Sequence, residues 1–196
     1  MPCLRETHFF TIVRSLLVKS LIVRSLFIRL FLVAGLAIPQ TSLAADVEYQ
    51  IKASYLYNFL QFVNFPKESL TESQEIHVCI LGVDLFGDAL DEIDGASTPQ
   101  GTLKISRLGP YKSSTPVDKC NVLYFSISEN AETETVMGQI DPRRILTISE
   151  YSPFIPYGGL IELYRKKDSI RFRVNENLVK ETHFKVAAQL VQLGVN

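Results

Sequence analysis

The sequence is poor in the residues from which catalytic and metal sites are usually built. Its 196 residues include three cysteines, three histidines and no tryptophan. His77 and His183 stand apart from each other, so neither has the nearby second ligand that a zinc site needs. The Gly-x-Ser-x-Gly elbow of hydrolases, the Gly-Lys-Ser/Thr ending of a P-loop and the glycine spacing of a dinucleotide-binding loop are also missing. The sequence therefore predicts no catalytic residue, no metal site and no cofactor.

The sequence also lacks an uninterrupted apolar run of the roughly 20 residues that cross a membrane as a helix. Five basic residues are spread over positions 5–29, and the uncharged run over residues 30–38 ends at Pro39. Ser42-Leu43-Ala44 then offers small residues where a signal peptidase cuts. We expect residues 1–44 to be a signal peptide cleaved after Ala44, and nothing in the remaining chain to insert into a membrane. An uncleaved membrane anchor is the alternative.

An excess of positive charge is missing from the expected mature chain. Residues 1–44 hold five of the 20 basic and one of the 21 acidic residues, which leaves 15 basic and 20 acidic residues and a net charge of −5. A protein that binds nucleic acid needs a strong positive field. We therefore expect no nucleic-acid partner.

Only two cysteines, Cys79 and Cys120, remain after signal cleavage. An oxidising compartment favours a disulfide between them. The alternative is a pair of buried free thiols that pack as small apolar side chains.

The pattern of apolar residues predicts alternating strands and helices in residues 45–196, a single domain. The order typical of a parallel sheet covered by helices suggests a three-layer α/β domain with an antiparallel hairpin at one edge. Expected strands are 76–81, at the sheet's centre, 102–108, 120–126, 145–149, and the hairpin 160–165 with 169–174; expected helices are 49–65, 86–93, 128–140 with Ser128 as its cap, and 177–193.

The first helix carries apolar residues over an arc of about 200°, whereas a helix with one buried side needs little more than 100°. It therefore either offers one flank to a partner or lies between the sheet and the last helix.

The loop over residues 82–87 follows the predicted central strand. Open α/β sheets bind ligands at the carboxyl ends of their strands, so Asp84 and Phe86 mark a possible ligand loop. An aspartate at such a position is more often a helix cap.

Six motifs, in order, resemble the YfiR/HmsC family of periplasmic regulators. They are Tyr-x-x-Lys-Ala-x-Tyr-Leu-Tyr-Asn-Phe from Tyr49, Val-Cys-Ile-Leu-Gly-x-Asp-x-Phe-Gly from Val78, Cys-x-Val-Leu-Tyr-Phe-Ser from Cys120, Leu-Thr-Ile-Ser from Leu146, Gly-Gly-Leu-Ile from Gly158 and Ile-Arg-Phe-x-Val-Asn from Ile170. The sequence departs from the family at Phe65, where tryptophan is usual, at Leu85, where proline is common, and at Asn121, where histidine is usual. The resemblance covers nearly all of the mature chain.

The resemblance implies a non-enzymatic periplasmic protein. Members of the family restrain an inner-membrane diguanylate cyclase by binding its periplasmic domain, which lowers cyclic di-GMP and biofilm formation, and their cysteines link redox state to stability. Cys79 and Cys120 would be the redox-linked pair. For the surface that meets the cyclase, or a second copy in a homodimer, we nominate Tyr55, Tyr57 and Phe62. The alternative function is a periplasmic small-molecule sensor that signals to a kinase or an outer-membrane transporter.

Overall fold

The computed structural model describes residues 41–66, 70 and 74–194, with the backbone alone for residues 41–46. Most of the predicted signal peptide, residues 1–40, lies outside the described residues. Residues 44–196 form one compact unit. The expected cleavage site after Ala44 falls in the first turn of helix α2, Thr41–Phe62.

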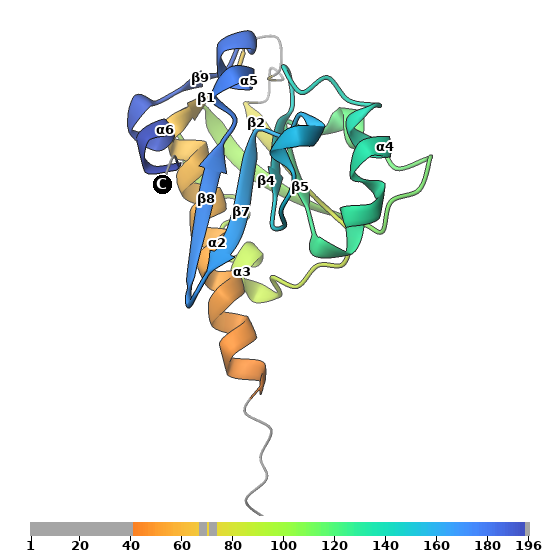
Figure 1. Ribbon diagram of the computed structural model, residues 1–196, viewed down its shortest axis with the longest axis vertical. Coiled ribbons are helices and arrows are strands. Elements are labelled where there is room, and N and C mark those ends of the chain that lie inside the picture. The colour runs from red at the N-terminus through yellow and green to blue at the C-terminus, as the bar shows by residue number, and fades with distance from the viewer. Residues whose placement is uncertain (1–40, 67–69, 71–73, 195–196) are drawn as a thin grey trace, which may run out of the picture. The chain divides into compact units, whose positions relative to one another are not determined.

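A seven-stranded sheet runs through the middle of this unit (Figure 1). Its strands lie in the order β3-β4-β2-β5-β6-β7-β8, and those from β4 to β7 are parallel. The strands are β2 Glu75–Leu81, β3 Ser97–Thr98, β4 Gly101–Gly109, β5 Val122–Phe125, β6 Leu146–Ser149, β7 Ile161–Lys166 and β8 Ser169–Val174. The mainly parallel sheet is confirmed, and β2 lies inside it, between β4 and β5.

Helices cover both faces of the sheet, which confirms the three-layer α/β fold (Figure 1). One face packs against α2, α3 (Asp88–Asp91), α5 (Glu176–Glu181) and α6 (Ala188–Gly194). The other packs against α4 (Thr133–Met137) and the short 3-10 helices η2 (Val117–Lys119), η3 (Ile127–Glu132) and η4 (Ile155–Tyr157) around it. All four residues of β5 and of β6 are buried. Strands with water on neither face tend to be continuously apolar, as β5 is, whereas β6 buries Thr147 and Ser149.

The antiparallel hairpin at the sheet edge is also confirmed. Strands β7 and β8 pair from Ile161 with Val174 to Lys166 with Ser169, so that Lys167 and Asp168 form the turn. Lys167 has a φ of 56°, a conformation that this tight connection imposes on a non-glycine residue.

The prediction of one helix over residues 177–193 is wrong, because this segment forms two short helices, α5 and α6, with a strand between them. Between α5 and α6 runs strand β9, Lys185–Val186, which pairs with β1, Val63–Asn64, in a second, two-stranded sheet. The same pairing ends the first helix at Phe62 rather than at residue 65. Phe184 is buried edge-on against Phe65 in this region. Residues 182–187 contain no glycine or proline that would signal the break. Pairing with a distant segment overrides their local preference for helix.

Two other helices are shorter than expected. The helix over 86–93 is reduced to α3, and the segment 128–140 divides into η3 and α4. Ser128 does not cap a helix, which corrects our expectation: its hydroxyl accepts a hydrogen bond from the Val83 N–H at 2.9 Å. The loop before β4 contains β3, which pairs with β4 antiparallel.

The Gly158-Gly159 step brings the chain against a buried ring. A Cβ atom at Gly159 would overlap the ring of Phe154, which is fully buried. At Gly138, by contrast, a Cβ atom would come no closer than 3.4 Å to another atom and the backbone is helical.

Replacing Gly159 by alanine is therefore expected to destabilise the protein by about 1–3 kcal/mol through overpacking. The control, Gly138→Ala, should leave the stability unchanged or raise it by a few tenths of a kcal/mol. Urea unfolding of the two variants measures both effects. Equal stabilities would show that Phe154 moves aside without cost.

Candidate functional site

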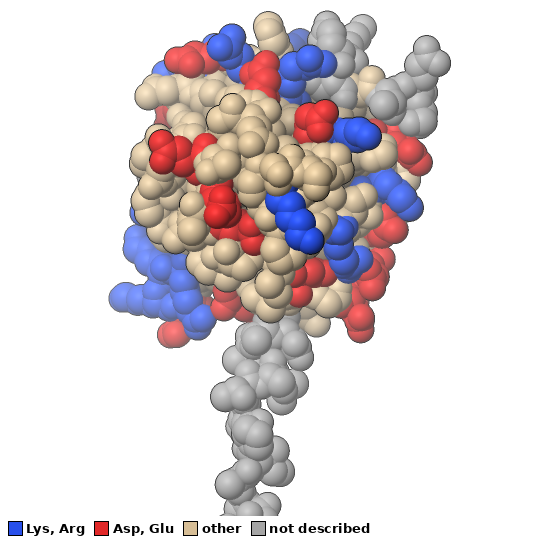
Figure 2. Space-filling view, turned by 90° about the vertical axis from the view of Figure 1, so that its right-hand side faces the viewer, with Lys and Arg blue, Asp and Glu red and all other residues tan. Residues whose placement is uncertain are grey.

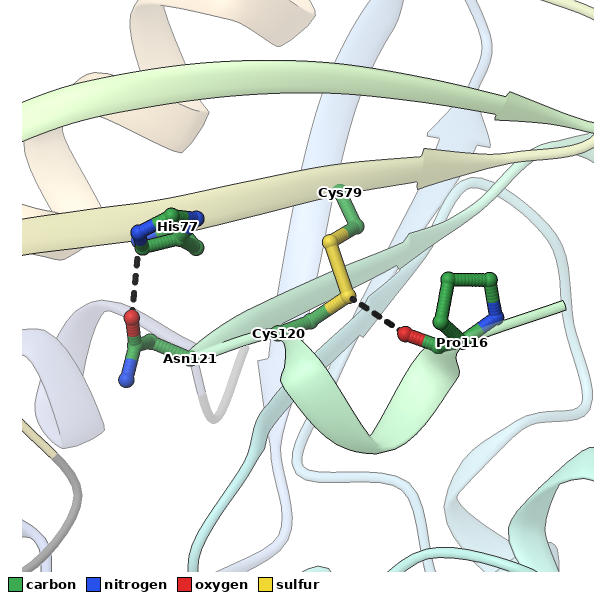
Figure 3. The surroundings of a disulfide bond; sticks show 5 residues. All are labelled: His77, Cys79, Pro116, Cys120 and Asn121. Carbon is green, nitrogen blue, oxygen red and sulfur yellow. Dashed lines mark hydrogen bonds between the residues drawn. A yellow bond between two sulfur atoms is a disulfide. The ribbon is translucent and has the colours of Figure 1, made fainter.

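A disulfide joins β2 and β5, two neighbouring strands in the interior of the sheet. Cys79 lies in β2 and Cys120 just before β5, with their Cα atoms 5.9 Å apart (Figure 3). This separation lies within the usual range for a disulfide. Both residues are 4% exposed, in the core between the sheet and α4. Of the two alternatives for these cysteines, the structure has the bonded pair.

Local sequence places the two cysteines next to each other. Side chains alternate along β2, so that Val78 and Ile80 face the α2 side while Cys79 and Leu81 face the α4 side. The single turn of η2 delivers Cys120 to the start of β5, and its sulfur lies 3.9 Å from the Pro116 carbonyl oxygen.

Asn121 reinforces the junction. Its side-chain oxygen accepts the His77 N–H at 2.7 Å, and its own N–H donates to the His77 carbonyl at 2.9 Å (Figure 3). These bonds lengthen the β2–β5 ladder beside the disulfide. Since the two strands belong to both cores, their junction supports the whole sheet.

The carboxyl edge of the same two strands carries the loop over residues 82–87. Across the sheet, the parallel strands lie in the order β4-β2-β5-β6-β7. Numbered by their position along the chain, this order is 2-1-3-4-5. Sheets of this order bind ligands between the first and third strands, which are β2 and β5 here. That space is filled: a Cβ atom at Gly82 would come within 2.7 Å of the Glu129 side chain and would overlap Ser128.

Both candidate ligand residues of this loop are engaged within the protein. Asp84 accepts a hydrogen bond from the Phe86 N–H at 2.8 Å and pairs with Arg107 at 2.5 Å. The Phe86 ring is buried in edge contacts with Tyr49 and Tyr124. These contacts assign Asp84 and Phe86 a structural role and give no support to a ligand site here. In the part of the chain that the structure describes, no group of three or more His, Cys, Asp or Glu residues could hold a metal ion.

The three residues nominated for a partner surface do not lie together. Tyr55 packs against Phe59 and Phe172, and its hydroxyl donates to the Ile170 carbonyl of β8 at 3.2 Å. Tyr57 lies on the opposite flank of α2 and donates to the Ser97 carbonyl at 3.2 Å. Phe62 is 42% exposed. Of the three, only Phe62 is exposed, while Tyr55 and Tyr57 are half-buried.

Sequence reasoning missed a buried ion pair that holds α2 on the sheet. Lys52 of α2 lies 2.7 Å from the carboxylate of Glu150, which follows β6, and these two side chains are 6% and 1% exposed. Glu48 lies 2.8 Å from the same ammonium group. Glu150 also accepts the Ile127 N–H at 2.8 Å. The signal was available, because Lys52 falls inside the apolar arc of the first helix.

Two tyrosines complete this cluster. The Tyr124 hydroxyl lies 3.3 Å from Glu150, and the Lys52 ammonium group lies 4.2 Å from the centre of the Tyr49 ring. Burial raises the pKa of Tyr124 well above its ordinary value, and the charge of Glu150 raises it further. Burial likewise raises the pKa of Tyr49. Both hydroxyls therefore stay neutral and can donate to the carboxylate.

The family model described as YfiR/HmsC-like matches residues 49–195. The chain belongs to this family. No curated protein matches the sequence. The matched range begins at Tyr49, inside α2, and takes in the disulfide, the Lys52–Glu150 pair and the whole sheet of this YfiR/HmsC-like domain. Among the described residues, no helix is long and apolar enough to cross a membrane.

We expect the disulfide to stabilise the domain substantially. Closing the 41-residue separation is worth about 4 kcal/mol in the chain-entropy model. Reduction, or the double change Cys79→Ser and Cys120→Ser, should therefore lower the free energy of unfolding by about 2–4 kcal/mol, measured in urea with and without reductant. The double variant is its own control, because reductant should not affect it. An unfolding midpoint that reductant leaves unmoved in the wild type would contradict this role.

We also expect the protein to lose stability when one partner of the buried Lys52–Glu150 pair is removed. Lys52→Ala leaves the Glu150 carboxylate buried without a cation, and should cost about 3–5 kcal/mol of stability. The matched control is Arg165→Ala, which removes a pair of 3.0 Å with Glu48 at the surface and should cost at most about 1 kcal/mol. Equal losses in the two variants would show that burial does not strengthen the Lys52–Glu150 contact.

Proposed function

We propose that this YfiR/HmsC-like protein is a periplasmic negative regulator that binds the periplasmic domain of an inner-membrane diguanylate cyclase and lowers the output of cyclic di-GMP. The observation that carries the proposal is the family match over residues 49–195. The Cys79–Cys120 disulfide suits an oxidising compartment, and the predicted signal peptide would deliver the chain there.

The site suggests how such a regulator would respond to its surroundings. Binding requires the folded domain, and the disulfide and the neighbouring His77–Asn121 hydrogen bonds join β2 to β5 inside the sheet. Reduction would lower the stability of this junction, and a destabilised repressor is removed by periplasmic proteolysis, since proteases act on the unfolded fraction. The cyclase would then be released when the compartment becomes less oxidising.

Deleting the gene is expected to raise cellular cyclic di-GMP several-fold, because the cyclase loses its inhibitor. Expression of the wild-type protein should restore the low level, whereas the double variant Cys79→Ser and Cys120→Ser should restore it less well in proportion to its lower abundance. Extraction and mass-spectrometric quantification of the nucleotide, with immunoblots of the periplasm, measure both quantities.

The control strain lacks the candidate cyclase, and there the deletion should change nothing. Affinity purification from solubilised membranes should recover a protein with a diguanylate cyclase domain. Unchanged nucleotide levels together with no cyclase in the purified fraction would overturn the proposal.

A further inference from the structure

The β7–β8 hairpin concentrates positive charge in an otherwise acidic chain. Residues 161–174 hold five basic and two acidic residues, a net charge of +3. The rest of the expected mature chain, residues 45–160 and 175–196, holds 10 basic and 18 acidic residues, a net charge of −8. Basic side chains gather at the lower left of Figure 2, on the side where Figure 1 draws the hairpin in front. A local field of this sign attracts anions to one part of the molecule.

Three of the hairpin's five basic residues are not neutralised by a described neighbour. The other two form ion pairs, which are Arg165 with Glu48 at 3.0 Å and Arg173 with Glu162 at 2.8 Å. Lys166, Lys167 and Arg171 are exposed and form no ion pair with another described residue. With the exposed Asp168 among them, these residues leave a net charge of +2 for an external anion.

Two exposed aliphatic side chains of α2 lie beside this charge. A groove of about 410 Å³ lies between the hairpin and the helix, with Arg171 on the hairpin side and Val47 and Ile51 on the helix side. Val47 and Ile51 are 52% and 42% exposed. A cationic wall beside an aliphatic one matches a phospholipid surface, where anionic headgroups cover an apolar interior. An acidic protein would match the charge but not the exposed aliphatic side chains, so the composition favours a lipid surface.

The acidic segment 84–94 lies on the other flank of α2. It holds five acidic residues and no basic one, and a second groove, of about 480 Å³, lies between it and the helix. An α-helix with its side chains is about 10 Å wide. At physiological ionic strength, exposed charges more than about 8 Å apart are largely screened from each other. A surface that contacts the hairpin flank therefore meets the basic residues, while the acidic segment stays too far away to repel it.

We propose that the β7–β8 hairpin, together with Val47 and Ile51, docks the domain on an anionic phospholipid surface. Binding is peripheral, at the headgroup layer, and needs no spanning helix. In the compartment of the proposed function, this surface is the periplasmic leaflet of the inner membrane. The proposal rests on that compartment but not on the cyclase. Docking would hold the regulator on the same membrane as its target, with the hairpin flank turned toward the lipid.

Sedimentation with lipid vesicles tests the proposal on the purified exported protein. Each lysine or arginine near an anionic membrane strengthens binding about fivefold. The net charge of +2 therefore predicts that vesicles of equal parts phosphatidylglycerol and phosphatidylcholine bind the protein at least about twentyfold more strongly than phosphatidylcholine alone. The preference should disappear at about 1 M salt, where the screening length falls to about 3 Å. No binding to the anionic vesicles at about 0.1 M salt would overturn the proposal.

Charge reversal shows whether the hairpin is the docking element. The double variant Lys167→Glu with Arg171→Glu should lose the preference for anionic vesicles, while its urea unfolding stays that of the wild type because both side chains are exposed and unpaired. The matched control is Lys104→Glu with Lys112→Glu, two exposed lysines outside the hairpin with the same change in net charge. It should keep the preference. Equal losses in the two variants would show that net charge alone governs binding, and would overturn the proposal.

The aliphatic contact has its own test. Ile51→Ser should weaken binding to the anionic vesicles about fivefold, because an apolar side chain no longer leaves water. The matched control is Ile127→Ser, since Ile127 is 50% exposed and belongs to η3 on the opposite face of the sheet. It should bind as the wild type does. Equal effects of the two changes would overturn the proposed docking face.

A competition experiment separates a lipid surface from a soluble phosphate ligand. Glycerol phosphate carries the anionic group without the apolar layer, so millimolar amounts should leave the protein on the vesicles. Release by glycerol phosphate would indicate a free phosphate compound as the ligand and overturn the proposal. None of these measurements involves a cyclase, so their failure would leave the proposed regulation of cyclic di-GMP standing.

Discussion

The junction between β2 and β5 is the contact on which the rest of the domain depends. These strands lie inside the sheet, and their side chains alternate between the two cores. The Cys79–Cys120 disulfide and the paired bonds of His77 with Asn121 hold them together at their amino ends. At the carboxyl ends, Gly82 allows η3 to close over the space between them. A change at the disulfide therefore affects both faces of the sheet at once.

Helix α2 has one side buried against the sheet and one side exposed to solvent. Its inner side is fastened by apolar contacts and by the Lys52–Glu150 pair, whose charges are acceptable in the core because each has partners. The exposed residues of its outer side are uncharged, with the basic β7–β8 hairpin on one side of the helix and the acidic segment 84–94 on the other. The buried pair fixes where the helix sits on the sheet, and thereby where the outer face points.

Much of the fold could be predicted because its pattern is local. The apolar runs Val78–Leu81 in β2 and Val122–Phe125 in β5 indicate strands covered on both faces, and Lys167-Asp168 between alternating segments indicates a hairpin. The errors share one cause. The last helix was expected to continue through Lys185–Val186, and the first through Val63–Asn64, because neither contains a helix breaker; these segments pair with each other across 120 residues of chain, which periodicity does not reveal. The nominated tyrosines show the same limit of local patterns. The sequence reveals the wide apolar arc of the helix, but not that Tyr55 bonds to Ile170 on one flank and Tyr57 to Ser97 on the other.

The sequence by itself determined the α/β class, the positions of the principal strands along the chain, the family, and the two cysteines available for pairing, since these follow from composition, periodicity and short motifs. Only the tertiary structure decided that Cys79 and Cys120 are bonded, that Lys52 pairs with Glu150 in the core, that Asp84 pairs with Arg107, and that the Phe86 ring is buried. It alone placed a basic hairpin and an acidic segment on either side of α2. Contacts between residues far apart in the chain depend on how the elements pack, and no local pattern encodes that packing.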